Sequence, residues 1–350
     1  MFKMTKTTTI SIAKDPLILV TGAAGLIGST IIWTLNKMGY KRIIAVDHLS
    51  TGEKWQNLRS LNILNYYEKK DFRELLAADN FSESFQIIFH LGACSDTTEV
   101  DASYLADNNF AYSKMLSLYA LRHKSRMIYA SSAATYGDGS NGFKDDENTI
   151  YKLRPLNKYG YSKQIFDQYL LHNNILLNKE NEASFIGVKY SNVFGPNEYH
   201  KAQMRSMILR SFEQITSTGK VKLFKSYMKE YGDGEQVRDF LYSKDAAKMT
   251  IFFMHEGRDL RGLYNIGIGY VRTWNDLAKA TFMALHKKSK IEYIEMPEEL
   301  KVRYQYYTCL DMSKYKNAGY KEEPIILENA IKDYVRYLKK DSHLGDLDNE

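Results

Sequence analysis

The chain has 350 residues, 44% of them hydrophobic, which is enough to bury a substantial core in one large α/β unit or in two intimate domains. Its 48 Lys and Arg against 42 Asp and Glu give a net charge of +6, spread along the sequence, so a nucleic-acid partner is not indicated and an anionic small molecule is acceptable. Cys94 and Cys309 are far apart and form no CxxC pair, so we expect neither a disulfide framework nor a metal site.

The sequence also lacks membrane and export signals. No apolar run approaches the about 18 residues that span a bilayer, and the Thr-rich start has no apolar signal core. We therefore expect a cytoplasmic protein with no membrane partner. Residues 1–15 are expected to form a flexible leader, and the acidic tail at 339–350 is expected to fray.

The first expected elements are a buried strand, a glycine turn and a helix. Residues 17–20 are an apolar run, and apolar residues then recur at helical spacing up to Leu35. The turn between them carries glycines in the spacing GxxGxxG, at Gly22, Gly25 and Gly28. Small residues in this context allow a tight turn and let backbone N–H groups approach a pyrophosphate. The segment is expected to bind a dinucleotide.

A second strand, 42–46, supports this interpretation because it ends at Asp47. That position is about twenty residues beyond the turn, where a carboxylate can accept hydrogen bonds from the adenosine ribose. A surface Asp after a structural turn is the alternative. Asp47 alone favours NAD, since a 2′-phosphate would meet a like charge, but Lys54 and Lys69 follow and can pair with that phosphate. We therefore expect NADP, with NAD as the alternative.

Two more strands, 86–91 and 126–130, are expected in the same sheet. They end in Gly92-Ala93-Cys94-Ser95 and in Ser131-Ser132. Ligands of open parallel sheets bind at such carboxyl ends, so both ends are expected at the site. Between the two strands, Asp107-Asn108-Asn109 is expected to open a helix. Its amides either cap that helix or hold the cofactor loop.

Tyr159 and Lys163 are four residues apart on an expected helix and therefore share a face. An ammonium near a phenol stabilises the phenolate, so the pKa of Tyr159 is expected to fall and Tyr159 can act as an acid/base. An exposed helix that happens to carry both residues is the alternative. The glycine turn and the Ser-Ser strand end favour the catalytic interpretation.

The alternation of strands and helices weakens after residue 190. One helix near 203–216 and a long irregular stretch follow, and loops of this length in compact enzymes are usually functional. We expect a dinucleotide-binding domain at 16–190 that is completed by later returns near 241–272. The substrate-binding domain is expected at 191–240 and 273–338.

The glycine turn, the Ser-Ser strand end and Tyr-x-x-x-Lys together resemble the extended short-chain dehydrogenase/reductase superfamily over nearly the whole chain. Within it, four segments are similar to the ADP-glyceromanno-heptose 6-epimerases: Tyr190-Ser191-Asn192-Val193-Phe194-Gly195-Pro196, Glu198-Tyr199-His200-Lys201, Gln236-Val237-Arg238-Asp239-Phe240 and Arg303-Tyr304-Gln305. The resemblance implies an α/β fold, a Rossmann-type doubly wound parallel sheet with a smaller, discontinuous α/β substrate-binding domain.

The resemblance also implies a reaction. ADP-D-glycero-D-manno-heptose would lose hydride from C6″ to a permanently held nicotinamide cofactor, and the ketone would take it back on the opposite face, for lipopolysaccharide core synthesis. Tyr159 and Lys201 would handle the proton on the two faces, and an exposed loop lysine is the alternative for Lys201. Ser132, or Ser131 one residue earlier, would bond the reacting oxygen. Lys163 would bind the nicotinamide ribose.

The implied site residues form two sets. The cofactor would be bound by Gly22, Gly25, Leu26, Ile27, Gly28, Asp47, His48, Lys54, Lys69, Leu91, Gly92, Ala93, Cys94, Ser95, Asn108, Tyr159, Lys163 and Val193. The substrate would be bound by Ser132, Asn192, Lys201, Gln203, Arg210, Phe224, Arg238 and Tyr304. Arg238 suits a bidentate grip on the diphosphate. Gln203 replaces a small hydroxyl residue, and the spacing from Phe224 to Arg238 is longer than the family form. A homo-oligomer is expected.

Three other functions fit parts of the pattern. A 4,6-dehydratase of the same superfamily would place an acidic pair after the strand-end hydroxyl, whereas this chain has Ala133 and Ala134 there. A 4-epimerase can manage without Lys201. A non-catalytic dinucleotide-binding sensor would not need Tyr159 and Lys163.

Overall fold

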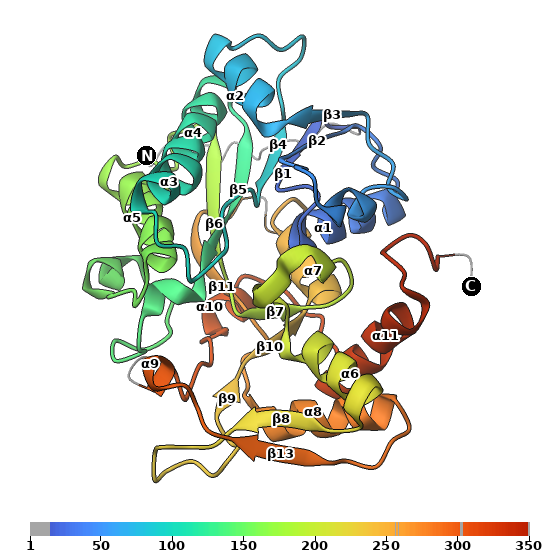
Figure 1. The fold of residues 1–350 in the computed structure, drawn as a ribbon. Coiled ribbons are helices and arrows are strands. Elements are labelled where there is room, and N and C mark those ends of the chain that lie inside the picture. The colour runs from blue at the N-terminus through green and yellow to red at the C-terminus, as the bar shows by residue number, and fades with distance from the viewer. Residues whose placement is uncertain (1–14, 256, 258, 302–303, 349–350) are drawn as a thin grey trace.

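A seven-stranded parallel sheet forms the centre of the computed structural model, which describes residues 15–255, 257, 259–301 and 304–348 (Figure 1). The strand order is β11-β6-β5-β4-β1-β2-β3. The strands are β1 (Ile18–Thr21), β2 (Ile43–Asp47), β3 (Asn65–Glu68), β4 (Ile87–His90), β5 (Arg126–Ser132), β6 (Ser184–Tyr190) and β11 (Gly262–Ile266). The expected flexible leader lies outside the described residues except for Asp15.

Helices cover both faces of this sheet (Figure 1). Helix α1 (Leu26–Lys37) packs with α7 (Ser243–Phe252) on one face, while α2 (Lys69–Ala78), α4 (Tyr112–His123) and α5 (Lys158–His172) cover the other. Every residue of β1, β2, β4 and β6 is buried, because helices pack on both faces of the parallel sheet. The predicted Rossmann-type doubly wound sheet is confirmed.

A second group of elements lies below the sheet in Figure 1. Its helices are α6 (Met207–Thr218), α8 (Trp274–Ala284) and α11 (Leu327–Lys340), which share an apolar cluster that contains Leu209, Leu277 and Ile331. Its strands form three short pairs: β7 (Asn192–Phe194) with β10 (Phe240–Tyr242), β8 (Val221–Phe224) with β13 (Ile291–Ile294), and β9 (Val237–Arg238) with β12 (Arg272–Thr273). The expected domain boundaries stay a prediction.

Short helical segments complete the described chain. They are η1 (Glu53–Asn57), α3 (Ala102–Leu105), η2 (Ala106–Ala111), η3 (Ala133–Tyr136), η4 (Glu147–Lys152), η5 (Tyr199–Met204), α9 (Glu298–Lys301) and α10 (Ser313–Asn317). None of the described helices is long and apolar enough to cross a membrane.

One expected helix start is wrong. The helix expected to open at Asp107 begins at Ala102, because the Asp101 side chain accepts from the backbone N–H groups of Ser103 and Tyr104 and caps it there. The Asn108 position instead falls inside η2, a π-helical turn that joins α3 to α4 without a break.

The expectation of a frayed acidic tail is wrong for residues 341–348. Leu344 is only 1% exposed. The Asp346 carboxylate accepts from Arg59 at 2.6 Å, and Asp348 lies 3.0 Å from the Lys37 ammonium. The acidic side chains meet basic groups of α1 and the η1 region, so their charge anchors the segment to the protein.

Candidate active site

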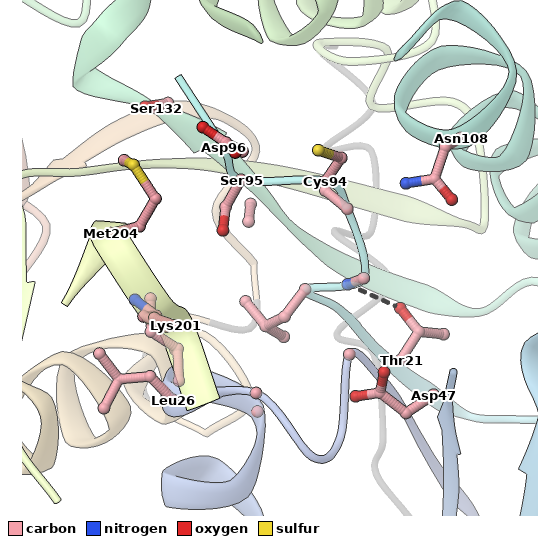
Figure 2. Close-up of a pocket in the computed structure, with 18 of the residues that line it drawn as sticks. Thr21, Leu26, Asp47, Cys94, Ser95, Asp96, Asn108, Ser132, Lys201 and Met204 are labelled. Carbon is pink, nitrogen blue, oxygen red and sulfur yellow. Dashed lines mark hydrogen bonds between the residues drawn. The ribbon is translucent and has the colours of Figure 1, made fainter. Parts of the chain in front are cut away.

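A cavity of about 520 Å³ lies at the carboxyl ends of the central strands. Its wall contains every residue expected to bind the cofactor, together with Ser132 and Lys201. Figure 2 shows Ser132 and Cys94 on one side of the space and Leu26 and Lys201 on the other. The strand order reverses between β1 and β4, and open α/β sheets bind their ligands at this point.

The glycine turn forms the floor of this cavity. Gly22 has a φ of +67°, and a Cβ atom added there would come within 2.7 Å of the Gly92 nitrogen. A Cβ atom on Gly28 would overlap the Gly22 carbonyl. The Thr21 hydroxyl accepts from the Gly92 N–H at 3.1 Å (Figure 2). The two loops are therefore in direct contact, and a side chain at either glycine would push these backbone segments apart.

Asp47 is held in place from both of its oxygens. Oδ2 accepts from the Ala24 N–H of the glycine turn at 2.7 Å, and Oδ1 accepts from the Lys54 ammonium at 2.6 Å. The Lys69 ammonium donates to Asn108 Oδ1 at 2.8 Å, on the same cavity wall. Lys54 and Lys69 thus both bring an ammonium group to the cavity wall, and Lys54 pairs with the carboxylate.

The cavity wall also contains residues that the sequence analysis missed: Thr21, Val46, Asp96, Tyr104, Tyr112, Ala130, Tyr190, Ser191, His200, Ala202 and Met204. The Tyr112 hydroxyl is buried and has no hydrogen-bond partner in the described part of the chain, so a ligand group or a water can bond to it. No sequence signal marks Tyr112, because one aromatic residue in a helix is ordinary. With the glycine floor, this hydroxyl fits a dinucleotide.

The contacts of Asn109 distinguish the two roles expected for the amides after Asp107, which are helix capping and holding the cofactor loop. Its Oδ1 accepts from the Cys94 N–H at 2.8 Å, and its Nδ2 donates to the Cys94 carbonyl at 3.0 Å. The same Nδ2 donates to Ser162 Oγ on α5 at 2.9 Å. Of the two alternatives, the amide therefore holds the cofactor loop. The π-helical turn turns two consecutive amides inward, which is a common use of such turns at functional sites.

Tyr159 and Lys163 both line the cavity from α5. Burial raises the pKa of Tyr159, and the neighbouring Ser132 side chain lowers it by less. The expectation that Lys163 depresses this pKa is wrong, because the ammonium is directed elsewhere and donates to the Ala130 carbonyl at 2.9 Å. Burial also lowers the pKa of Lys163 to about 8.

The two strand-end serines have different partners. The Ser131 hydroxyl donates to Asp167 at 2.6 Å, beside the Lys189 ammonium, which lies 2.8 Å from the same carboxylate. The Ser132 hydroxyl accepts from the Ala134 N–H at 3.1 Å. Its hydrogen bond with Tyr159 lowers the pKa of that phenol. Ser131 is thus committed to a buried network below the site, while Ser132 adjoins the phenol.

Lys201 lies on the loop from 197 to 206, which contains η5. Its N–H donates to the Glu198 carbonyl at 3.0 Å, and the Glu198 carboxylate accepts from the Ser206 N–H at 2.7 Å. Ala202 interrupts the helical turn with a φ of 46°. Burial lowers the pKa of Lys201, and Glu198 opposes this shift. The side chain is therefore not that of an exposed loop lysine, since it lines the cavity (Figure 2).

A second cavity, of about 460 Å³, adjoins the first, and Met204 lines both. Its wall contains four of the residues expected to bind substrate, together with an indole and a further lysine: Gln203, Arg210, Phe224, Tyr304, Trp274 and Lys222. Among the described residues, no group of His, Cys, Asp or Glu is arranged to hold a metal ion.

Asn192 and Arg238 lie on the wall of neither cavity. The Arg238 guanidinium donates to the Val237 carbonyl at 2.8 Å and to the Gln305 carbonyl at 2.5 Å. It also lies 5.4 Å from the centre of the Tyr304 ring. Backbone carbonyls thus engage two of the five N–H donors of the guanidinium, and the expected bidentate grip on a diphosphate stays a prediction.

Residues 18–267 match the model of the NAD dependent epimerase/dehydratase family, and the chain belongs to this family. A relative from Nitratidesulfovibrio vulgaris, named ADP-L-glycero-D-manno-heptose-6-epimerase, is 43% identical over 328 residues, which is 93% of this chain and 99% of that protein. A relative from Fusobacterium nucleatum with the same name is 44% identical over 338 residues, 94% of this chain and all of that protein. The predicted resemblance to this group and the predicted epimerase, an isomerase, are confirmed.

Solved structures agree with the fold. The Helicobacter pylori ADP-L-glycero-D-manno-heptose-6-epimerase is 25% identical, with a TM-score of 0.72 over 93% of this chain and 97% of that one. The Thermotoga maritima UDP-glucose 4-epimerase is 27% identical, with a TM-score of 0.75 over 93% and 99%. Because both match this well, the fold does not separate a 6-epimerase from a 4-epimerase. The family is NAD dependent, so a nicotinamide dinucleotide is its cofactor.

Proposed function

We propose that the protein converts ADP-D-glycero-D-manno-heptose to ADP-L-glycero-D-manno-heptose through a transient 6-keto intermediate, for lipopolysaccharide core synthesis. The observation that carries the proposal is Lys201, which shares a cavity with Tyr159 and lies across it from Ser132 (Figure 2). Inversion at C6″ requires proton exchange from two positions, and two candidate groups are present. The two relatives named 6-epimerases, 43% and 44% identical over nearly the whole chain, support the substrate.

The bound nicotinamide dinucleotide would supply the oxidation and re-reduction of C6″. In this proposal Tyr159, whose pKa burial raises, keeps its proton at neutral pH and donates it to the reacting oxygen. Lys201, whose pKa burial lowers, accepts the proton of the C6″ hydroxyl as hydride leaves, so that Tyr159 donates its proton to the ketone oxygen when hydride returns in the other orientation of the sugar. Ser132 bonds the reacting oxygen beside Tyr159, and Lys163 binds the nicotinamide ribose.

We propose NADP as the cofactor, with NAD as the alternative. The charge of Asp47 would repel a 2′-phosphate, but the Lys54 ammonium 2.6 Å away offsets it. Lys69 adds a second positive charge on the same wall. A cytoplasmic location and a homo-oligomeric state belong to the same proposal, on the strength of the resemblance.

The second cavity is proposed to hold the ADP part of the substrate. The rings of Phe224, Trp274 and Tyr304 can enclose an adenine, and Arg210 can pair with the diphosphate. Asn192, beside Val193 of the first cavity, is kept as a contact to the sugar. Arg238 is kept as a contact to the diphosphate, and its cation–π contact orients the Tyr304 ring.

Lys201→Met tests the proposal. It replaces a side chain of similar length, so the fold and bound cofactor are expected to persist while epimerisation, followed by NMR of the ADP-heptose products, falls about 10²–10⁴-fold. Lys229→Met is the matched control, because Lys229 is an exposed lysine of the following loop and should retain the full rate. Addition of Tyr159→Phe should cost far less than the product of the single losses if both residues serve one cycle.

An unaltered rate in Lys201→Met would remove this residue from the mechanism. The rival would then be a 4-epimerase that uses a single acid/base, and turnover of UDP-glucose by the intact protein would support that rival. Failure of the intact protein to epimerise ADP-D-glycero-D-manno-heptose at all would defeat the substrate assignment itself.

A further inference from the structure

Residues 342–348, here called the C-terminal strap, leave α11 and reach α1, where Asp348 contacts Trp33 (Figure 1). The strap is fixed at its far end, where Asp346 accepts from Arg59 at 2.6 Å and Asp348 accepts from Trp33 Nε1 at 3.0 Å. Its near end is buried, with His343 6% and Leu344 1% exposed. These contacts fix the strap in one position on the protein surface.

The near end of the strap contacts the loop that carries Lys201. The Tyr199 hydroxyl donates to the Ser342 carbonyl at 2.8 Å, and the Tyr199 ring meets the His343 ring edge-on at 5.0 Å. The Leu344 N–H donates to Asn197 Oδ1 at 3.0 Å. Both contacted residues, Asn197 and Tyr199, lie within four positions of Lys201.

Asn197 connects the strap to the cofactor cavity. It is fully buried, with a φ of +75°, and its Nδ2 donates to Ser29 Oγ on α1 at 2.9 Å. The Asn57 Nδ2 donates to the Asn197 carbonyl at 2.9 Å and to the Ala24 carbonyl of the glycine turn at 2.8 Å. The start of the loop is thus held between the strap on one side and the glycine turn on the other.

The loop itself has little internal support. Its helical turn spans only Tyr199–Met204 and is interrupted at Ala202. It nevertheless presents Lys201 to the first cavity and Gln203 to the second. The position of the ammonium therefore depends on the contacts at Asn197 and Tyr199 and on the Glu198–Ser206 bonds at the other end.

We infer that the C-terminal strap is a positioning element of the active site, which holds the Lys201 loop in register with the glycine turn through Asn197 and Tyr199. The inference rests on the proposed function, in which Lys201 exchanges a proton at C6″. Neither contacted residue faces the reacting atoms, so their effect passes through the loop backbone. A displacement of about 1 Å at a catalytic group costs on the order of 10²-fold in rate.

The test compares the intact protein with a chain that ends at Asp341 and with Tyr199→Phe, all loaded with cofactor. The shortened chain is expected to retain cofactor and KM but to lose about 10- to 100-fold in kcat for ADP-heptose epimerisation. Tyr199→Phe removes one hydrogen bond and should lose less, in the same direction. Lys229→Met is again the control, because Lys229 is exposed and lies outside both the strap and the Lys201 loop, and its kcat should stay close to that of the intact protein.

A cycle with Lys201→Met separates positioning from general stability. In that background, loss of the strap should cause no further fall in kcat, because the group that it positions is already gone. An equal fall in both backgrounds, or full kcat in the shortened chain and in Tyr199→Phe, would overturn the inference.

A second readout does not use the substrate. NMR of the reductively ¹³C-methylated protein reports the titration of Lys201, assigned by its loss in Lys201→Met. Loss of the strap should move this pKa back toward the ordinary value of 10.5. An unchanged pKa overturns the strap inference even if the intact protein proves inactive on ADP-heptose, whereas that inactivity by itself defeats only the proposed function.

Discussion

Asp167→Asn is expected to destabilise the protein strongly. Asp167 and Lys189 form an ion pair of 2.8 Å with side chains 0% and 1% exposed. The carboxylate also accepts from Tyr129 at 2.9 Å and from Ser131 at 2.6 Å. Asn keeps the volume but removes the charge, so the Lys189 ammonium would stay buried without its counter-ion. Breaking a buried pair from one side costs about 3–5 kcal/mol, a large part of the roughly 5–15 kcal/mol that holds a domain folded.

Urea unfolding, followed by tryptophan fluorescence and circular dichroism at equal cofactor load, measures this loss. Asp79→Asn is the control, because its 2.7 Å pair with Arg122 is partly exposed at 26% and 56%, so its loss should lower the free energy of unfolding much less. Adding Lys189→Met to Asp167→Asn should recover most of the stability, since no buried charge is then unpaired. A loss below about 1 kcal/mol for Asp167→Asn, or a double variant less stable than the single, would refute the reasoning.

Three further predictions concern the chemistry. Tyr159→Phe should lower epimerisation about 10²–10⁴-fold with the cofactor still bound; a near-normal rate by product NMR would show that the proton goes elsewhere. Mass spectrometry of the extracted cofactor should give NADP, and NAD alone would contradict the role assigned to Lys54 and Lys69. Burial lowers the pKa of Lys163 from 10.5 to about 8, so the unfolded chain binds more protons between these values. The free energy of unfolding should therefore rise with pH in that window, and Lys163→Met should remove this rise.

The cofactor cavity was predictable because parallel strands bring their carboxyl ends to one edge whatever their exact pairing. Gly22, Asp47 and Cys94 each follow an apolar run, so each was expected on the same wall before any contact was known. Tyr159 and Lys163 were expected together because helical spacing places them on one face. Periodicity and local turn chemistry are sufficient for such positions.

Depth of burial is not available from spacing. The helix predicts that Lys163 lies near Tyr159, but desolvation of the phenol outweighs any nearby charge, and the pKa rises where a fall was expected. Arg238 illustrates the same limit. Its charge suits a diphosphate, yet the backbone carbonyls that it contacts, including Gln305 at 2.5 Å, are brought to it only by the folded chain.

Long-range contacts account for the error at the C-terminus. A run of acidic residues predicts a solvated tail, because the sequence does not show whether basic groups lie close to it in the folded protein. Arg59, which binds Asp346, is separated from it by 287 positions. Asn197 accepts from the Leu344 N–H and is separated from Leu344 by 147 positions. No local pattern connects such pairs.

The Lys201 loop lies where the two cavities meet, and its supports come from both sides. Ala24 and Ser29 hold it to the dinucleotide side through Asn57 and Asn197. Ser206, the N-cap of α6, holds it to the substrate side through Glu198. A change in the separation of these two sides must therefore move the ammonium relative to the cofactor. The proton exchange assigned to Lys201 thus requires the correct placement of both sides, whereas cofactor binding requires only the dinucleotide side. Variants of the supports should accordingly lower kcat before they lower cofactor content.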